Sequence, residues 1–190
     1  VLDACAAPGG KTAVLSEMMN DTGRVYAWDT HAHRVELIRG TVNRLKLENV
    51  RPAVKDASVP REDMAMTLDA ALIDAPCSGT GVMTEKPDVK YRVTAEGVQS
   101  LCLTQAAILD AVAPMVKVGG AFLAMKAEDC TEEVEAAANA RTILGAPDAE
   151  VLHYTVPFDE VSRAIVRLQK TQVTPEKYPR RFKKIQTSPL

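Results

Sequence analysis

The sequence lacks several patterns that would assign the protein to a broad class at once. Its 190 residues contain only four cysteines, Cys5, Cys77, Cys102 and Cys130, and no CxxC pair. This wide spacing argues against a structural zinc site and against the disulfide framework of a small secreted protein, so we expect free thiols and no metal. No stretch is typical of a membrane span or of a signal peptide, which predicts a cytoplasmic protein without a membrane partner.

The sequence also lacks an excess of either positive or negative charge. The net charge is −2 and apolar residues make up 46% of the chain, a composition typical of a folded globular protein. A chain of this length suits one domain, which buries roughly 70% of the surface that it exposes when unfolded. It has no internal repeats, and it begins without Met inside a strand-like pattern, so we expect any preceding natural segment to be missing. The oligomeric state stays open.

Short runs rich in Val, Ile and Leu alternate with stretches of helical periodicity, which predicts an α/β fold with a mainly parallel sheet. We expect seven strands, near 1–4, 24–29, 51–55, 69–74, 119–126, 150–156 and 163–170. Helices are expected near 10–20, 31–46, 94–117 and 130–144. Because only the short link from Pro157 to Glu160 joins the last two strands, they should form a terminal antiparallel hairpin.

The last twenty residues differ in composition from the rest of the chain. One acid stands there against five basic residues, Lys177, Arg180, Arg181, Lys183 and Lys184, with three prolines interspersed. We expect residues 171–190 to form an extended basic tail, which either contacts RNA phosphates or is a solvated terminus without a partner. Composition alone leaves both alternatives open.

A loop of small residues, Ala6 to Lys11, follows the first expected strand. In a doubly wound sheet, ligands bind at the C-terminal ends of the strands, and the first such loop usually holds them. Small side chains let a ligand approach the backbone, and the N–H groups that open the next helix can receive its polar end. The loop has neither the GxxxxGK[ST] spacing of a P-loop nor the GxGxxG spacing of dinucleotide-binding proteins.

Three later strands end near an aspartate. Asp29 lies about twenty residues after the loop, where an acid suits the two hydroxyls of a ribose. Asp56 follows the third strand, where it could receive an adenine amino group, and Asp74 ends the fourth. Each aspartate alone is typical of a helix cap or a loop. Together with the loop of small residues, they indicate an adenosine-containing ligand.

The segment that starts at Asp74, DAPCSGTGVM, places Cys77 between a proline and Ser-Gly. An exposed, partly activated thiol suits such a loop, whereas a free cysteine elsewhere is more often a small buried hydrophobic residue. The surrounding Pro, Ser and Gly favour the exposed loop.

These motifs together resemble a known family. VLDACAAPGGKT at 1–12, Asp29, DAPCSGTGVM, KPDVKY at 86–91 and TQAAILDAV at 104–112 are similar to the catalytic domain of the Sun (Fmu) family of S-adenosylmethionine-dependent rRNA cytosine-5 methyltransferases. The resemblance covers about 1–120 and implies a single Rossmann-like class I methyltransferase domain over 1–190, with small-subunit rRNA as its partner. It also implies that S-adenosylmethionine is held by Cys5, Ala6, Ala7, Pro8, Gly9, Gly10, Lys11, Asp29, Asp56 and Asp74.

The chemistry of that family uses two cysteines. One thiolate adds to carbon 6 of cytosine and makes carbon 5 nucleophilic, and the other assists release of the product. The resemblance implies that Cys77, beside Asp74, is the second thiol. The nucleophile is expected at the end of the fifth strand, where this sequence has Ala127. Cys130, three residues later, is the remaining candidate.

After Gly119-Gly120 the chain resembles a second family. FLAMKAEDCTEEVEAA, SRAIVRLQKT at 162–171 and TPEKYPRR at 174–181 are similar to the C-terminal part of glucose-inhibited division protein B, an rRNA guanine-7 methyltransferase. This resemblance implies a chimera of two methyltransferases, with 121–190 of the guanine-7 type. Three functions stay open: cytosine-5 methylation of 16S rRNA, guanine-7 methylation without a covalent catalyst, and a fold that binds cofactor and RNA with negligible turnover.

Overall fold

A computed structural model of the chain describes residues 1–190 except 80–87, 89–90, 92, 157–160 and 189. The described residues form a seven-stranded sheet in the order β3-β2-β1-β4-β5-β7-β6. Its strands are β1 (Leu2–Asp3), β2 (Val25–Asp29), β3 (Val50–Val54), β4 (Leu68–Ile73), β5 (Val116–Ala127), β6 (Ala149–Thr155) and β7 (Ser162–Gln169). The first five are parallel, and β7 is antiparallel to both β5 and β6.

The predicted α/β class and the antiparallel pairing of the last two strands are therefore confirmed. The predicted link from Pro157 to Glu160 lies outside the described residues, as do residues 80–83 of the DAPCSGTGVM segment and most of KPDVKY.

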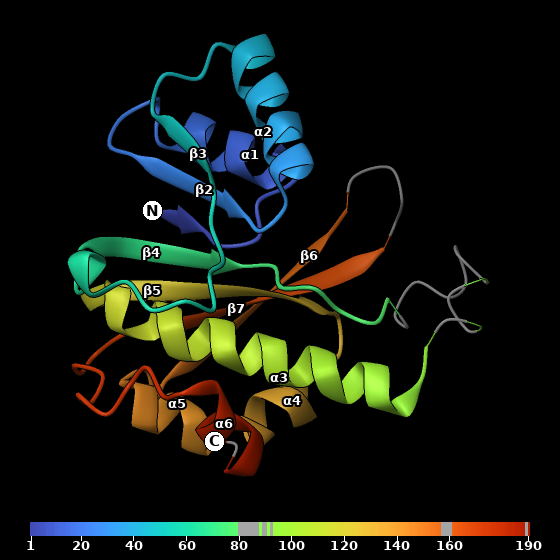
Figure 1. Ribbon diagram of the computed structural model, residues 1–190, viewed down its shortest axis with the longest axis vertical. Coiled ribbons are helices and arrows are strands. Elements are labelled where there is room, and N and C mark those ends of the chain that lie inside the picture. Colours follow the sequence, from blue (N-terminus) through green and yellow to red (C-terminus); the bar gives the residue numbers. More distant parts are fainter. Residues whose placement is uncertain (80–87, 89–90, 92, 157–160, 189) are drawn as a thin grey trace.

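Helices cover both faces of the sheet (Figure 1). They are α1 (Gly10–Met18), α2 (Ala32–Leu45), α3 (Ala95–Val112), α4 (Thr131–Ala136), α5 (Ala138–Leu144) and α6 (Phe182–Thr187). The residues of β2 show why two layers are needed. Val25 and Ala27 belong to a buried cluster with Ile38 of α2, whereas Trp28 belongs to the main core with Ile108 of α3. Alternate residues of one strand are thus buried on opposite faces, as a parallel sheet requires.

The segments before and after Gly119-Gly120 share one sheet. Ala70 to Ile73 of β4 pair in register with Ala121 to Ala124 of β5. A Cβ at position 120 would lie 2.6 Å from the carbonyl oxygen of Asp69, so only glycine allows the two strands to approach this closely. Because β4 leads into the Cys77 segment, both parts of the chain contribute to the same end of the sheet.

Two helix predictions need correction. The helix expected at 94–117 ends at Val112 and continues as a 3-10 turn, Ala113–Met115, because Pro114 has no N–H to donate to the carbonyl one turn earlier. The helix expected at 130–144 is divided between α4 and α5. At the division, Arg141 Nη2 donates to the carbonyl oxygen of Val134 at 3.2 Å, an acceptor that an unbroken helix would offer to its own backbone.

The prediction of an extended basic tail is wrong for much of residues 171–190. Tyr178 and Ile185 are buried, and residues 182–187 form α6. Arg180 Nε lies 2.7 Å from the carboxylate of Asp110 on α3, and both side chains are almost fully buried. The tail contains apolar residues that the core accepts, and Asp110 needs a buried cation as its partner. Lys177, Arg181, Lys183 and Lys184 remain exposed.

The stretch from Ala95 to Met115, which contains α3, passes a test of length and composition for a membrane-spanning helix, with a mean hydropathy of 1.2. The same test is passed by core helices. Ile108, Val112 and Met115 of this stretch lie in the main hydrophobic core against β4 and β5. Its apolar composition is explained by that packing.

Candidate functional site

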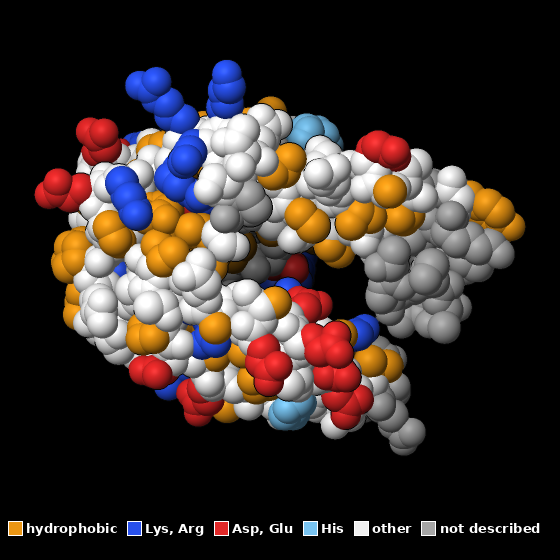
Figure 2. Space-filling model, turned by 90° about the horizontal axis from the view of Figure 1, so that it is seen from below, with side chains coloured by type: hydrophobic (Ala, Val, Ile, Leu, Met, Phe, Trp, Pro, Cys, Tyr) orange, Lys and Arg blue, Asp and Glu red, His pale blue; other side chains and the backbone are white. Residues whose placement is uncertain are grey.

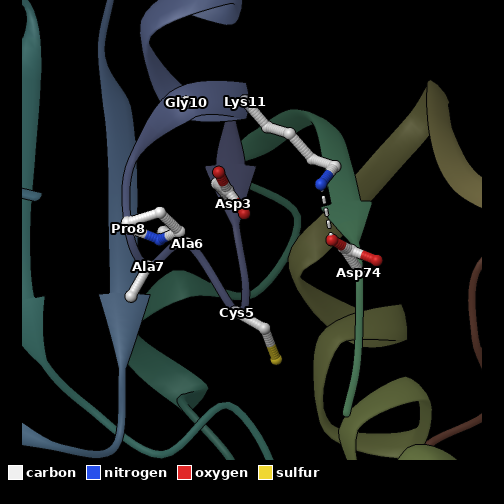
Figure 3. Close-up of a pocket in the computed structure, with 8 residues that line it drawn as sticks. All are labelled: Asp3, Cys5, Ala6, Ala7, Pro8, Gly10, Lys11 and Asp74. Atoms are coloured by element: carbon white, nitrogen blue, oxygen red, sulfur yellow. Dashed lines mark ion pairs between the residues drawn. The ribbon is translucent and has the colours of Figure 1, made fainter. Parts of the chain in front are cut away.

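A cavity of about 330 Å³ opens where β1 and β4 end and α1 begins. Figure 3 shows the residues that line it: Asp3, Cys5, Ala6, Ala7, Pro8, Gly10, Lys11 and Asp74. We call this space the first cavity. Seven of the eight come from the first eleven residues of the chain. The structure thus brings together most of the predicted loop and joins Asp74 to it.

Glycine shapes the loop of the first cavity in two ways. Gly9 has a φ of +105°, and a Cβ there would lie 3.3 Å from the Cα of Ile38, so a side chain would be strained and would press on α2. At Gly10, by contrast, a Cβ would meet nothing within 4 Å. The loop is therefore held tightly against α2, while its other side borders open space.

Asp3 is a residue of this cavity that the sequence analysis missed. Its side chain is 1% exposed, and its Oδ2 accepts a hydrogen bond from the Thr12 hydroxyl at 2.7 Å. Its Oδ1 is buried and has no hydrogen-bond partner. Burial raises the pKa of Asp3 to about 6, against the lowering effects of Thr12 and the nearby Lys11. The available signal was its position, because Asp3 is the acid that ends the first strand.

Cys5 lines the cavity as a protonated thiol. Burial raises the pKa of Cys5 to about 12, and the negative charges of Asp3, Asp29 and Asp74 act in the same direction. A thiol in this state is a poor nucleophile at neutral pH. Cys5 therefore contributes shape rather than covalent chemistry.

Lys11 and Asp74 form an ion pair across the cavity. The Lys11 ammonium group lies 2.8 Å from Asp74 Oδ2, and Figure 3 shows the lysine reaching from the start of α1 toward the end of β4. Both side chains are partly exposed, so the pair contributes little to stability, roughly 1 kcal/mol or less. Its effect is to place one positive and one negative group at the mouth of the cavity.

The other two predicted aspartates lie outside the first cavity. Asp29 is buried at the end of β2, where Arg34 Nη1 lies 3.2 Å from its Oδ2 and the N–H of His31 donates to Oδ1 at 3.1 Å. Arg34 also donates to the carbonyl oxygen of Ala7 at 3.3 Å, so it links Asp29 to the loop. Asp56 is exposed and accepts hydrogen bonds from the backbone and hydroxyl of Ser58.

A second cavity of about 340 Å³ lies beside the first, and Asp74 lines both. Its walls come from the end of β4, from β5 and β7, from α3, and from α4 and α5. Apolar residues such as Leu109 and Phe122 form part of these walls, with Cys77, Gln105, Lys126, Glu133 and Arg141 as the other polar or ionisable groups. Unlike the first cavity, it is assembled from segments far apart in the chain.

Cys77 is exposed at the second cavity, as the sequence predicted. Gln105 of α3 donates from Nε2 to the carbonyl oxygen of Pro76 at 2.7 Å. This hydrogen bond ties the Cys77 segment to a helix that packs on the core. The position of the thiol is thus set by β4, which precedes this segment, and by α3.

The thiol expected to act as the nucleophile does not reach this cavity. Ala127 ends β5, and the next cysteine, Cys130, is 4% exposed and packs with Ala164 and Val166 of β7. Since the chain has only four cysteines and Cys102 lies on α3 outside both cavities, Cys77 is the one thiol that lines the second cavity.

Charge near the second cavity is unevenly distributed. Lys126 of β5 forms an ion pair with Glu133 of α4, and both side chains line the cavity. Glu128, Asp129, Glu132 and Glu135 surround this pair in the sequence. Figure 2, in which the molecule is seen from below, shows a hollow with acidic side chains gathered along one side. Within the described residues, no three His, Cys, Asp or Glu side chains form a group that could hold a metal ion.

Comparison with known proteins supports the first resemblance. A family model described as 16S rRNA methyltransferase RsmB/F matches residues 1–180. The probable ribosomal RNA small subunit methyltransferase B of Bacillus subtilis (strain 168) is 43% identical over 124 residues, which are 65% of this chain and 28% of that protein. The match therefore spans little more than a quarter of the length of this curated relative.

Solved structures agree on the fold. The crystal structure of PH0851 is 28% identical with a TM-score of 0.72, and the match covers 89% of this chain and 42% of that one. NSun6 from Pyrococcus horikoshii, solved with SFG, is 22% identical with a TM-score of 0.69, covering 90% of this chain and 47% of that one. At 22% identity, the latter likeness shows the fold alone. The expected Rossmann-like methyltransferase fold is confirmed.

The family match also bears on the two-family interpretation. Residues 1–180 run through Gly119-Gly120 and include most of the part that resembles the guanine-7 family. The guanine-7 resemblance and the chimera stay predictions that no match confirms. Because one family model matches nearly the whole chain, the chain belongs to the 16S rRNA methyltransferase RsmB/F family.

Proposed function

We propose that this chain is the S-adenosylmethionine-dependent methyltransferase domain of an RNA-modifying enzyme. The first cavity would hold the cofactor, and the second would receive the RNA base that accepts the methyl group. The observation that carries the proposal is Asp74, which lines both cavities, so a cofactor in one and an acceptor in the other would lie next to each other. Methyl transfer needs this adjacency, because the two reacting atoms must meet directly.

The residues of the first cavity fit the cofactor. The small loop leaves its backbone open to a ligand, Gly10 leaves space beside the start of α1, and Asp3 Oδ1 is a buried acceptor without a donor. When bound, S-adenosylmethionine supplies an electrophilic methyl group on a positively charged sulfur. Lys11 and Asp74 would orient its polar end, and Cys5, Ala6, Ala7, Pro8 and Gly9 would supply the shape of the site.

Asp29 and Asp56 are proposed to contact the ribose and adenine parts. Asp29 already holds Arg34 and the His31 N–H, so ribose hydroxyls would share its carboxylate with them. Asp56 is exposed and free to turn toward a ligand, apart from its hydrogen bonds to Ser58. A cofactor-bound form should therefore show rearrangement at Asp29 and Asp56, and little at the loop.

The proposed partner is small-subunit rRNA, in keeping with the name of the Bacillus subtilis relative, and such a substrate would place the protein in the cytoplasm. RNA phosphates can be contacted by four exposed basic residues, Lys177, Arg181, Lys183 and Lys184. We expect that removing any one of these charges lowers the affinity for RNA and weakens the dependence of that affinity on salt. Deleting residues 171–190 is an unsuitable test, because Tyr178 and Ile185 belong to the folded structure. Substituting the exposed lysines by glutamine tests the contact without unfolding the tail.

The acceptor chemistry divides into two candidates. Cytosine-5 methylation needs a thiolate that adds to carbon 6, and Cys77 is the one thiol at the second cavity, so it would have to act as that nucleophile without Cys130. Guanine-7 methylation needs no covalent catalyst, because a ring nitrogen is itself nucleophilic. The burial of Cys130 and the alanine at position 127 are the specific observations that favour this second candidate.

One experiment tests the proposal and separates the candidates. The chain is incubated with methyl-labelled S-adenosylmethionine and unmodified small-subunit rRNA, and the labelled nucleosides are identified. Cytosine-5 chemistry predicts 5-methylcytidine, lost in Cys77→Ala and kept in Cys130→Ala and in the matched control Cys102→Ala. Guanine-7 chemistry predicts 7-methylguanosine that survives all three substitutions. Binding of cofactor and RNA without any labelled nucleoside would contradict the enzymatic proposal and leave a binding fold.

A further inference from the structure

Arg141 of α5 lines the second cavity with hydrogen-bond donors that the protein itself does not use. Its Nη1 donates to the carbonyl oxygen of Pro147, and its Nη2 donates to that of Val134 at 3.2 Å. A guanidinium group has five N–H donors, so three have no acceptor among the described residues. One of these is Nε, which is buried, and an unpaired buried donor is costly because it has lost its contact with water. An orphaned donor beside a cavity indicates that a ligand supplies the acceptor.

The charges around the second cavity indicate which kind of acceptor is missing. Glu133 is paired with Lys126, and Asp74 is paired with Lys11. Among the described residues Arg141 has no carboxylate partner, because both of its hydrogen bonds go to neutral carbonyl groups. The ionisable groups of the lining thus balance except for this one cation. The missing acceptor is therefore an anionic oxygen.

Acidic residues close by in the sequence limit how much anion can bind here. Glu128, Asp129, Glu132 and Glu135 are exposed, and none of them lines the second cavity. Water and salt screen exposed charges, so these acids do not cancel the charge of Arg141 inside the cavity. They do repel a long stretch of a polyanion. The arrangement suits one anionic group rather than a row of them.

We propose that Arg141 binds a phosphate group of the nucleotide that accepts the methyl group. The inference rests on the proposed function and deepens it, because phosphate is the anionic group of RNA. Two phosphate oxygens would accept from Nε and from a terminal nitrogen, the paired geometry that guanidinium and phosphate groups favour. The base would lie against apolar walls that include Leu109 and Phe122. The second cavity would then hold the nucleotide by its backbone as well as by its base, and no covalent bond is made or broken.

The size of the cavity agrees with such a ligand. Its volume of about 340 Å³ falls at the lower end of the range of pockets that enclose small molecules, roughly 300–1,000 Å³. It therefore has room for a single nucleotide, with the neighbouring nucleotides of the strand outside.

Calorimetry on the whole chain compares ligands with and without phosphate. The probes are cytidine and guanosine 3′,5′-bisphosphate, which carry both phosphates that flank a nucleotide in RNA, and the two unphosphorylated nucleosides. At constant ionic strength, we expect one of the bisphosphates to bind roughly 10-fold to 100-fold more tightly than its nucleoside, the range of a hydrogen bond to a charged group. A short single-stranded RNA should displace it. A bisphosphate that RNA cannot displace would point to a free nucleotide as the ligand and overturn the inference.

The variant Arg141→Gln removes the charge and keeps an amide donor. It should lower the affinity for the bisphosphate to that of the nucleoside and leave the nucleoside unchanged. Arg44→Gln, which changes an exposed arginine of α2 outside both cavities, is the matched control and should bind like the wild type. Equal losses in both variants would mean that the phosphate responds to overall charge, and would overturn the role of Arg141.

A measurement on the wild-type chain keeps the inference testable if Arg141→Gln does not fold. In the NMR spectrum of arginine Nε–H groups, the signal of Arg141 should shift when the bisphosphate is added and stay in place with the nucleoside. Tighter binding of the bisphosphate without this shift would place the phosphate elsewhere and overturn the inference.

The outcomes also separate the inference from the proposed function. Wild-type chain that binds nucleoside and bisphosphate equally well overturns the role of Arg141 and leaves the acceptor cavity intact. Wild-type chain that binds none of the four probes up to millimolar concentration overturns both.

Discussion

The two cavities meet at Asp74 but are built in different ways. Seven of the eight residues that line the first cavity lie within the first eleven positions, and they follow a strand, a loop and a helix start in direct succession. The second cavity takes its residues from six strands and helices spread over 73–168. The first is therefore specified by local sequence, whereas the second depends on how distant segments pack together. Substitutions should accordingly affect cofactor binding and acceptor binding separately.

The largest expected effect concerns the C-terminal segment, which packs on α3 through the Arg180–Asp110 ion pair. Asp110→Ala leaves Arg180 buried without its partner, and removing one member of a buried pair costs roughly 3–5 kcal/mol. Urea unfolding should show this as a large drop in the midpoint. The matched control is Asp63→Ala, which breaks the exposed pair with Arg61 and should leave the midpoint unchanged. Equal midpoints for wild type and Asp110→Ala would show that the C-terminal segment does not contribute to the stability of the fold.

A smaller effect is expected at the first cavity, and it depends on pH. Because burial raises the pKa of Asp3 to about 6 in the folded chain, the folded state binds more protons than the unfolded state between about pH 4 and 6. The contribution of Asp3 is therefore fully present below pH 4 and is lost as the pH rises through 6. A shift of this size corresponds to about 3 kcal/mol.

Asp3→Asn should remove that dependence. Urea unfolding of the wild type between pH 4 and 7.5 is expected to show a loss of stability that the variant does not share, provided that the remaining groups titrate alike. A parallel pH profile in both proteins would mean that the pKa of Asp3 is not raised by burial in the folded chain.

The smallest effect concerns the placement of the Cys77 thiol. Gln105→Leu removes the hydrogen bond to the Pro76 carbonyl, worth about 1 kcal/mol, so the rate of Cys77 alkylation should change by roughly fivefold. Gln99→Leu, on the same helix but outside both cavities, is the control and should leave the rate unaltered. Cys130 should react only on unfolding in all three proteins. Alkylation of Cys130 in the native state would put a second thiol within reach of the second cavity.

Sequence patterns predicted the first cavity better than the second. The loop from Ala6 to Lys11 follows the first strand, and Asp74 follows the fourth. Because the C-terminal ends of parallel strands meet at one edge of the sheet, these positions predict that the loop and Asp74 lie together. Asp3 was missed because a single buried acid in a strand has no spacing signal of its own. The unpaired state of its Oδ1 is visible only once the surrounding atoms are placed.

The limits of prediction in the second half have a physical origin. The position of Cys130 near a helix start was evident from the sequence, but its burial against Ala164 and Val166 depends on pairing between β5 and β7, which are about forty residues apart. At the break between α4 and α5, the Arg141 side chain donates to the Val134 carbonyl, a contact that no local sequence pattern predicts. The packing of the C-terminal segment involves the ion pair between Arg180 and Asp110, which lies seventy residues earlier. No local sequence pattern predicts that partner.

The most direct test of the central claim, a cofactor in the first cavity, is calorimetric titration of S-adenosylhomocysteine into the wild-type chain and two glycine variants. Gly10→Leu adds bulk beside the first cavity, and Gly40→Leu adds the same bulk on α2; a Cβ at either position meets nothing within 4 Å, so both chains should fold. We predict saturable binding at one site in the wild type and in Gly40→Leu, and its loss in Gly10→Leu. No heat of binding up to millimolar ligand in the wild type, or unchanged affinity in Gly10→Leu, would contradict the account.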